Sequence, residues 1–278
     1  MSTPATPTLA LSNGDRIPQV GLGTWPMDDA TVERVVPTAV EAGYRLFDTA
    51  ENYENERGVG RGLRATGVPR EELFVTTKFN KKWHSVDGVR QACEASLERL
   101  NLDYLDLFLI HWPNPDQDRY VEAFQGLLEL RRTGLVRAIG TSNFTPAHLQ
   151  RLIDETGSAP EVNQLQISPY VVQEKGRAFA AQHGILVQSW SPLARGPGLR
   201  SEPVVTELAH KYGRTPAQIV LRWHIELGLV PVPKSEDPQR LRENIAVFDF
   251  TLTPEEVAQL AALDRGTELV LDPETFGH

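Results

Sequence analysis

The chain of 278 residues has a mass of 31.0 kDa and a hydrophobic content of 40%, enough to bury one large core or two average ones. Its formal net charge of −9 argues against a phosphate-backbone partner, and no apolar run approaches the roughly 18 residues of a membrane span. The single cysteine excludes an intrachain disulfide, and residues 1–8 lack the basic and apolar regions of a signal peptide. We therefore expect a cytoplasmic protein, monomeric by default, that binds neither nucleic acid nor a membrane.

The first predicted element is a β-hairpin within residues 8–19. Asn13-Gly14 separates two short apolar runs there, and this dipeptide suits a type I′ turn because both central residues of that turn need positive φ. After the hairpin, strand-like and helix-like segments alternate. Eight strands are predicted, at residues 20–24, 45–49, 73–78, 104–112, 136–142, 162–168, 185–191 and 229–235.

Helices are predicted between and after these strands. The intervening segments have a helical period, and several begin at Ser, Thr or Asp and end at Gly, as helices do. Pro37 lies inside the first of them and predicts a kink there. The helical segments cover residues 28–43, 55–67, 85–100, 118–134, 145–157, 173–184, 201–213 with 215–228, 237–248 and 252–264.

Eight units of a strand followed by a helix, each of roughly 35 residues, are typical of a (β/α)8 barrel. We therefore predict an α/β protein, a (β/α)8 TIM barrel with an N-terminal β-hairpin, in which residues 1–278 form a single domain. The main alternative is a doubly wound sheet, which would need G-x-G-x-x-G between a strand and a helix. Residues 21–26 and 58–63 place Pro26 and Leu63 where the third glycine should be, and such near matches are common by chance.

Polar or aromatic side chains end nearly every predicted strand after the first. In barrel enzymes the chemistry takes place at these C-terminal strand ends, and packing alone would not require the pattern. No metal site is expected, because the seven histidines lack metal-ligand spacing and no H-E-x-x-H motif is present. The residues at the strand ends are Asp48, Lys78, His111, Ser142, Asn143, Gln164, Gln166, Trp190, Ser191, Lys234 and Ser235.

Four residues predict an acid–base centre when they are taken together, although each alone would suit an ordinary structural role. Asp48 and Lys78 end adjacent strands and can pair across the barrel mouth, and Tyr53 lies on the loop after Asp48. A cation beside a phenol favours the phenolate, so Lys78 should lower the pKa of Tyr53 from its usual value of about 10 and make it a general acid. His111 can hold a substrate oxygen, and the set implies a carbonyl that receives a hydride.

The order and spacing of the motifs resemble the aldo-keto reductase family over residues 8 to 265. The matching stretches are GLGTW, DTAENYENERGVG, TTK, LDLFLIHWP, GLVRAIGTSNF, VNQLQISPY, SWSPLARG and VPKSEDPQRLRENIAVFDF. The chain is most like the bacterial branch that includes 2,5-diketo-gluconic acid reductases. The resemblance implies reduction of a small-molecule aldehyde or ketone with NADPH. It also implies that Tyr53 donates the proton, that Lys78 and Asp48 form the ion pair that tunes it, and that His111 orients the carbonyl.

A cofactor site follows from the same resemblance. The ring of Trp190 would stack on the nicotinamide, and Lys234 and Arg240 would meet the 2′-phosphate of NADPH. The acids Glu236 and Asp237 lie between these two cations, and Asp237 is expected to be turned away as a helix N-cap. The cofactor-binding residues implied are Gly23, Thr24, Ser142, Asn143, Gln164, Trp190, Ser191, Leu193, Lys234, Ser235, Arg240 and Asn244.

The substrate pocket that the resemblance implies combines aromatic walls with amide groups. Asn80 stands where the family often has an aromatic residue, with Trp83 three positions later, and Asn52 stands where the family often has an apolar one. Trp25 and Trp112 match the usual apolar walls. These five residues favour polar or hydroxylated carbonyl substrates, without naming the physiological one.

Two other functions remain open from the sequence. The family fold also serves non-catalytic members, a redox-sensing channel subunit and a lens structural protein, although the intact set of four candidate catalytic residues disfavours this alternative. An aldolase could instead use Lys78 in a Schiff base. Oxidation of NADPH with a simple aldehyde would separate the first alternative from a reductase, and borohydride trapping on Lys78 would identify the second.

Overall fold

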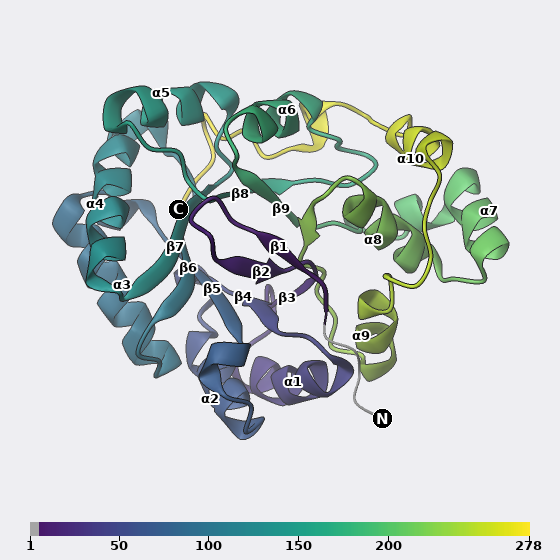
Figure 1. Ribbon diagram of the computed structural model, residues 1–278, viewed down its shortest axis with the longest axis horizontal. Coiled ribbons are helices and arrows are strands. Elements are labelled where there is room, and N and C mark those ends of the chain that lie inside the picture. Colours follow the sequence, from purple (N-terminus) through teal and green to yellow (C-terminus); the bar gives the residue numbers. More distant parts are fainter. Residues whose placement is uncertain (1–5) are drawn as a thin grey trace.

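A barrel of eight parallel strands forms the centre of the protein in a computed structural model that describes residues 6–278 (Figure 1). Each strand pairs with the next along the chain, and the Gly23 N–H donates to the Pro233 carbonyl at 3.2 Å, which links the first strand to the residues just after the last one. A Cβ on Gly23 would lie 2.7 Å from the Val232 carbonyl oxygen, so this approach needs glycine. The strands are β3 (Gly21–Gly23), β4 (Leu46–Asp48), β5 (Phe74–Phe79), β6 (Leu105–Ile110), β7 (Val136–Ser142), β8 (Val162–Gln166), β9 (Leu186–Trp190) and β10 (Val230–Pro231). The predicted (β/α)8 barrel is confirmed.

Helices surround the barrel as an outer ring (Figure 1). Thr145, Thr215 and Thr253 each close a capping box at a helix start, as their place in the sequence predicts. The first helix runs through Pro37. The helices are α1 (Asp29–Ala42), α2 (Glu56–Ala65), α3 (Val86–Leu100), α4 (Tyr120–Thr133), α5 (Pro146–Thr156), α6 (Glu174–Gln182), α7 (Pro203–Tyr212), α8 (Pro216–Glu226), α9 (Pro238–Ile245) and α10 (Pro254–Ala261). Among the helices of residues 6–278, none combines the length and the hydropathy that a membrane-spanning helix requires.

The predicted hairpin is confirmed as β1 (Thr8–Ala10) and β2 (Arg16–Pro18), but the predicted type I′ turn is wrong. Gly14 has a φ of 93°, whereas Asn13 is not among the residues with positive φ. The Gly14 N–H donates to the Leu11 carbonyl, and the Leu11 N–H to that of Asp15. The connection is therefore a three-residue loop with glycine at its last position, a geometry that also suits the Asn-Gly pair.

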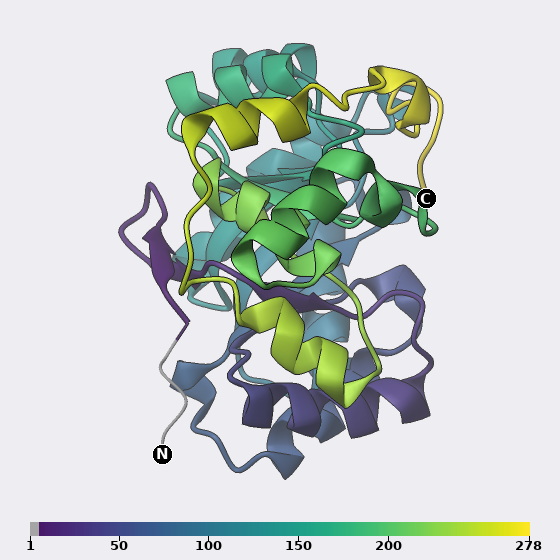
Figure 2. The same ribbon diagram turned by 90° about the vertical axis from the view of Figure 1, so that its right-hand side faces the viewer.

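The hairpin closes one end of the barrel and leaves the other end for the site. Ile17 packs with Leu46, Phe74 and Val162, which begin three of the barrel strands. Figure 2 shows the hairpin and the C-terminus of the chain at opposite ends of the barrel. The carboxyl ends of the strands therefore face the C-terminal segment, which we define as residues 265–278.

Two short 3₁₀ turns lie beside the strand ends. Turn η1 (Glu51–Tyr53) follows β4, and turn η3 (Lys81–Trp83) follows β5. Since β4 and β5 are paired neighbours, the two turns lie on adjacent loops. The remaining 3₁₀ turns are η2 (Arg70–Glu72), η4 (Pro115–Gln117), η5 (Gly198–Ser201) and η6 (Thr267–Leu269).

Candidate active site

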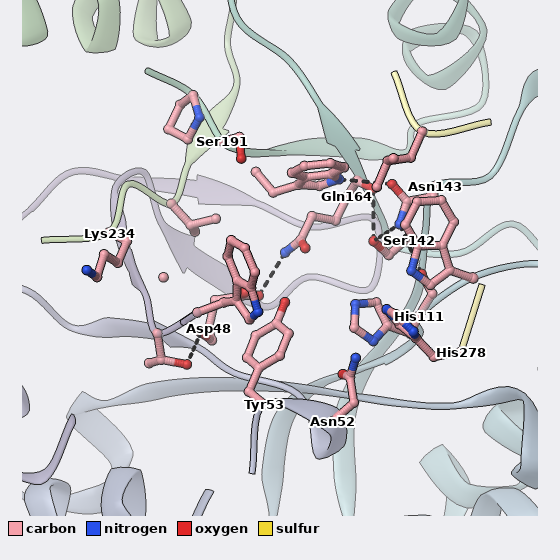
Figure 3. A pocket seen from close by; sticks show the side chains of 18 of the residues that line it. Asp48, Asn52, Tyr53, His111, Ser142, Asn143, Gln164, Ser191, Lys234 and His278 are labelled. Carbon is pink, nitrogen blue, oxygen red and sulfur yellow. Dashed lines mark hydrogen bonds between the residues drawn. The ribbon is translucent and has the colours of Figure 1, made fainter. Parts of the chain in front are cut away.

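A cavity of about 700 Å³ opens at the carboxyl ends of the strands (Figure 3). Most of the candidate residues from the sequence contribute to its wall, and they come from β3, β4, β6, β7, β8, β9 and β10 or from the loops that follow these strands. The predicted residues in the wall are Gly23, Thr24, Trp25, Asp48, Asn52, Tyr53, His111, Trp112, Ser142, Asn143, Gln164, Trp190, Ser191 and Lys234.

Lys78 lies beneath this wall and is fully buried. Its ammonium donates to Asp48 Oδ1 at 2.7 Å and to the Thr49 carbonyl at 2.9 Å, and it lies 3.4 Å from the hydroxyl oxygen of Tyr53. The pairing of β4 with β5 produces this contact, since Asp48 lies opposite Thr76, two residues before Lys78. Figure 3 shows the Tyr53 hydroxyl pointing into the cavity, between Asp48 and His111.

The pKa of Tyr53 moves in the direction opposite to the one expected from the sequence. Burial raises the pKa above its ordinary value of 10.0, and this exceeds the lowering effect of the Lys78 ammonium, while Asp48 raises it further. The expectation of a lowered pKa was wrong because it counted the cation and omitted burial and the carboxylate. Burial alone would lower the pKa of Lys78, but Asp48 and Tyr53 raise it overall, so the lysine stays charged.

His111 lies beside the Tyr53 ring, with the two ring centroids 5.8 Å apart. Burial lowers its pKa well below 6.5, and the charges of Lys78 and His278 lower it further. The imidazole is therefore neutral near pH 7. Its Nδ1 is buried and has no hydrogen-bond partner within residues 6–278. A neutral imidazole can donate a hydrogen bond from one nitrogen, so His111 can orient a carbonyl oxygen beside the phenol.

A network of hydrogen bonds fixes the wall opposite Tyr53. The Asn143 amide donates to Ser142 Oγ at 3.0 Å and to the His111 carbonyl at 3.1 Å. The Trp190 indole N–H donates to Asn143 Oδ1 at 2.9 Å, and the Gln164 amide donates to Asp48 Oδ2 at 2.7 Å. An indole beside amide and hydroxyl groups fits a flat aromatic ring that carries a carboxamide, as in nicotinamide.

A second cavity, of about 380 Å³, adjoins the first, and Lys234 lines both. The Lys234 ammonium pairs with Glu236 at 2.5 Å. Asp237 caps α9 and accepts a hydrogen bond from the Arg240 backbone N–H at 2.9 Å, which confirms its predicted place as N-cap. The predicted cofactor residues in this cavity are Leu193, Lys234, Ser235, Arg240 and Asn244.

Two predicted substrate residues lie beside the main cavity and not in its wall. Asn80 and Trp83 are both bound to Glu51, through the Asn80 backbone N–H at 3.3 Å and the Trp83 indole N–H at 3.0 Å. These bonds hold the Trp83 side chain against η1, the turn that contains Glu51. The Trp25 side chain does line the cavity and is 51% exposed at its mouth.

The C-terminal segment supplies wall residues that were absent from the sequence-based set. Phe276 contacts the Trp112 ring, with centroids 4.7 Å apart, and the His278 ring lies 5.6 Å from that of His111. Leu271 also lines the cavity. Neither a helical period nor a strand period marks this segment, and only its place in the fold brings it over the strand ends.

Comparison with known proteins gives a consistent result. A model of the Aldo/keto reductase family matches residues 19–265. The chain is 49% identical over 276 residues to a methylglyoxal reductase DkgA of Salmonella typhimurium, which covers 98% of this chain and 99% of the relative. An aldo-keto reductase of Bombyx mori, solved in complex with NADP, is 40% identical with a TM-score of 0.89 over 94% of both chains. A Gox0644 mutant solved in complex with NADPH is also 40% identical, with a TM-score of 0.93 over 98% and 99%. The resemblance found in the sequence is thereby confirmed, and the chain belongs to the aldo/keto reductase family of oxidoreductases.

Proposed function

We propose that the protein reduces aldehydes and ketones to alcohols with NADPH, and that Tyr53 donates the proton. The observation that carries this proposal is the contact of Tyr53 with a buried, charged Lys78 that is paired with the Asp48 carboxylate, at a cavity that His111 and Trp190 also line. We further propose that residues 1–278 act as one domain. The wall of the cavity supports this, since it draws residues from Gly23 through to His278.

In this proposal each of the four catalytic side chains has its own role. The neutral His111 imidazole binds the carbonyl oxygen and holds it near the Tyr53 hydroxyl. NADPH, when bound, supplies the hydride that the carbonyl carbon receives. Tyr53 Oη transfers its proton to the carbonyl oxygen, and the charged Lys78 stabilises the phenolate that remains. Asp48 compensates the buried ammonium, which would otherwise be costly in the protein interior.

The two adjoining cavities support NADPH as the cofactor. The main cavity offers Trp190 and the neighbouring amides to a nicotinamide, and the second offers Arg240 and Lys234 to a phosphate. The N-terminus of α9 also favours an anion there. Two similar proteins were solved with NADP or NADPH bound, which supports the same cofactor for this chain.

Small carbonyl compounds with a second oxygen, such as methylglyoxal, are the substrates we propose. Relatives that are 49% and 50% identical carry the name methylglyoxal reductase. In this chain Trp112 lines the cavity, and its indole N–H is buried and has no hydrogen-bond partner in residues 6–278. The second oxygen of such a substrate can accept from this N–H, whereas an alkyl chain would leave it unpaired.

The test is oxidation of NADPH, followed at 340 nm, with methylglyoxal, a simple alkyl aldehyde of equal size and a no-substrate blank. We expect steady oxidation with both, and a higher kcat/KM for methylglyoxal. Absence of turnover with every carbonyl, together with normal NADPH binding, would contradict the proposal and favour a non-catalytic member of the family. The aldolase alternative is disfavoured, because Lys78 is charged and fully buried.

Replacing Trp190 with alanine should weaken NADPH binding about two- to tenfold, the scale of one aromatic stacking contact. It should also remove most of the fluorescence quench on cofactor binding, although four other tryptophans remain. Titration of NADPH with fluorescence detection measures both effects. Trp190→Tyr is the matched control, since it keeps a stacking ring and should restore affinity without the indole emission. An undiminished quench in Trp190→Ala would place the stacking residue elsewhere.

A further inference from the structure

Glu51 is a nearly buried acid beside the site, with 12% of its side chain exposed. Both of its oxygens lie 3.0 Å from the Trp83 indole nitrogen, which donates to them. The carboxylate also accepts from the Asn80 backbone N–H at 3.3 Å and pairs with the Lys82 ammonium at 2.5 Å. All three partners belong to residues 80–84, so one side chain joins η1 to the loop that contains η3.

One of the two joined segments lines the cavity, and the other binds a segment that lines it. Turn η1 contains Asn52 and Tyr53, which lie directly after Glu51 in the chain. The loop with η3 holds the C-terminal segment, because the Lys81 backbone N–H donates to the His278 carbonyl at 2.6 Å. His278 in turn lines the cavity beside His111, with the two ring centroids 5.6 Å apart, together with Leu271 and Phe276.

We propose that Glu51 is a positioning residue for the carbonyl substrate. Glu51 does not line the cavity. It acts by keeping the distance between η1 and the loop of residues 80–84 fixed. That separation sets the distance between Asn52 and the C-terminal segment, which both line the cavity. The proposal goes beyond the function proposed above, in which Glu51 has no part, although its kinetic readout uses the same reductase activity.

The cofactor side should be insensitive to Glu51, because its predicted residues come from β3, β7, β8, β9, α9 and the loops beside them, and Glu51 bonds to none of them. Proton transfer should also be less sensitive than substrate binding. Lys78, which is paired with Asp48, donates to the Tyr53 hydroxyl independently of Glu51. A positioning role for the substrate therefore predicts a change in KM that is larger than the change in kcat.

Glu51→Ala and Trp83→Phe test this prediction from both partners. Each should raise KM for methylglyoxal about tenfold, the scale of one hydrogen bond to a charged group, with kcat within about threefold and NADPH affinity unchanged. The double variant should be no worse than the stronger single one, because both changes remove the same contact. Glu51→Gln should lie between wild type and Glu51→Ala, since its amide oxygen can still accept from Trp83.

Glu54→Gln is the matched control for Glu51→Gln. Glu54 is exposed and adjoins the same turn, so its replacement removes an equal charge without touching the contact, and it should leave KM unchanged. Hydrogen exchange gives a readout that needs no turnover: in Glu51→Ala the amides of Lys81 and residues 272–278 should exchange faster, with α7 and α8 unchanged.

Three results would overturn the inference. They are an unchanged KM with unchanged exchange, an equal loss of NADPH affinity, or a lower melting temperature with wild-type kinetics. Should Glu51→Ala fail to fold, Glu51→Gln and Trp83→Phe decide the question by the same measures. Failure of the wild type to reduce any carbonyl would instead count against the proposed function. The hydrogen-exchange experiment would then still test whether Glu51 holds the C-terminal segment in place.

Discussion

Replacement of Tyr53 by phenylalanine should lower the rate of carbonyl reduction by about 10²- to 10⁴-fold, the range that general acid catalysis contributes. The change deletes the hydroxyl that lies 3.4 Å from the Lys78 ammonium and leaves the ring in place. NADPH affinity should stay near that of the wild type, because the cofactor residues come from other strands. Single-turnover NADPH oxidation and fluorescence titration measure the two quantities separately.

Tyr104→Phe is the control for this variant. It removes the same atom from a tyrosine whose hydroxyl is buried and has no hydrogen-bond partner in the described part of the chain, so activity should not change. A Tyr53→Phe enzyme within threefold of wild type would show that another group supplies the proton.

The pH dependence follows from the raised pKa of Tyr53. A group with a raised pKa keeps its proton at higher pH, so kcat for reduction should be constant through the neutral range. It should fall only on the alkaline side of the ordinary phenol value of about 10. Oxidation of an alcohol needs the phenolate as base and should rise through the same range. A fall in reduction centred near neutrality would instead support the lowered pKa that the sequence suggested.

The contact between Asp48, Lys78 and Tyr53 could be predicted from the sequence because it depends on strand order alone. Once two strands are neighbours and parallel, polar residues at their carboxyl ends must lie close together. The direction of the Tyr53 pKa could not be predicted in the same way. It depends on how deeply the phenol is buried, and that depth is set by loops and by the C-terminal segment, not by spacing along the chain.

The placement of Asn80 and Trp83 depends on contacts that the sequence does not show. The family resemblance implied both as substrate residues, but neither lines the cavity, and Glu51 binds the Asn80 backbone N–H and the Trp83 indole N–H beside it. The last strand shows a similar limit. Residues 229–235 were predicted as extended, but β10 has only two residues, in part because Pro231 and Pro233 have no N–H to donate to a neighbouring strand.

The choice between NADPH and NADH should depend on Arg240. Replacing it with alanine should lower NADPH affinity by roughly 10- to 100-fold, the scale of a charge-assisted hydrogen bond, and change NADH affinity little. Arg240 lies in the first turn of α9 and lines the second cavity. Asp237 is the N-cap of this helix, and its carboxylate accepts hydrogen bonds from the backbone N–H groups of the first turn. The carboxylate is therefore turned away from a phosphate in the cavity.

Lys234 should contribute less than Arg240, because Glu236 pairs with it at 2.5 Å. Glu236→Gln should therefore raise NADPH affinity a few-fold by freeing the ammonium, with little effect on NADH. Arg242→Ala is the control, since Arg242 is an exposed arginine on the same helix that does not line the cavity. Fluorescence titrations with both cofactors at low and high salt measure these effects, since screening weakens exposed charge pairs. Equal losses of NADPH and NADH affinity in Arg240→Ala would show that Arg240 does not bind the phosphate, and a wild-type preference for NADH would contradict the proposed cofactor.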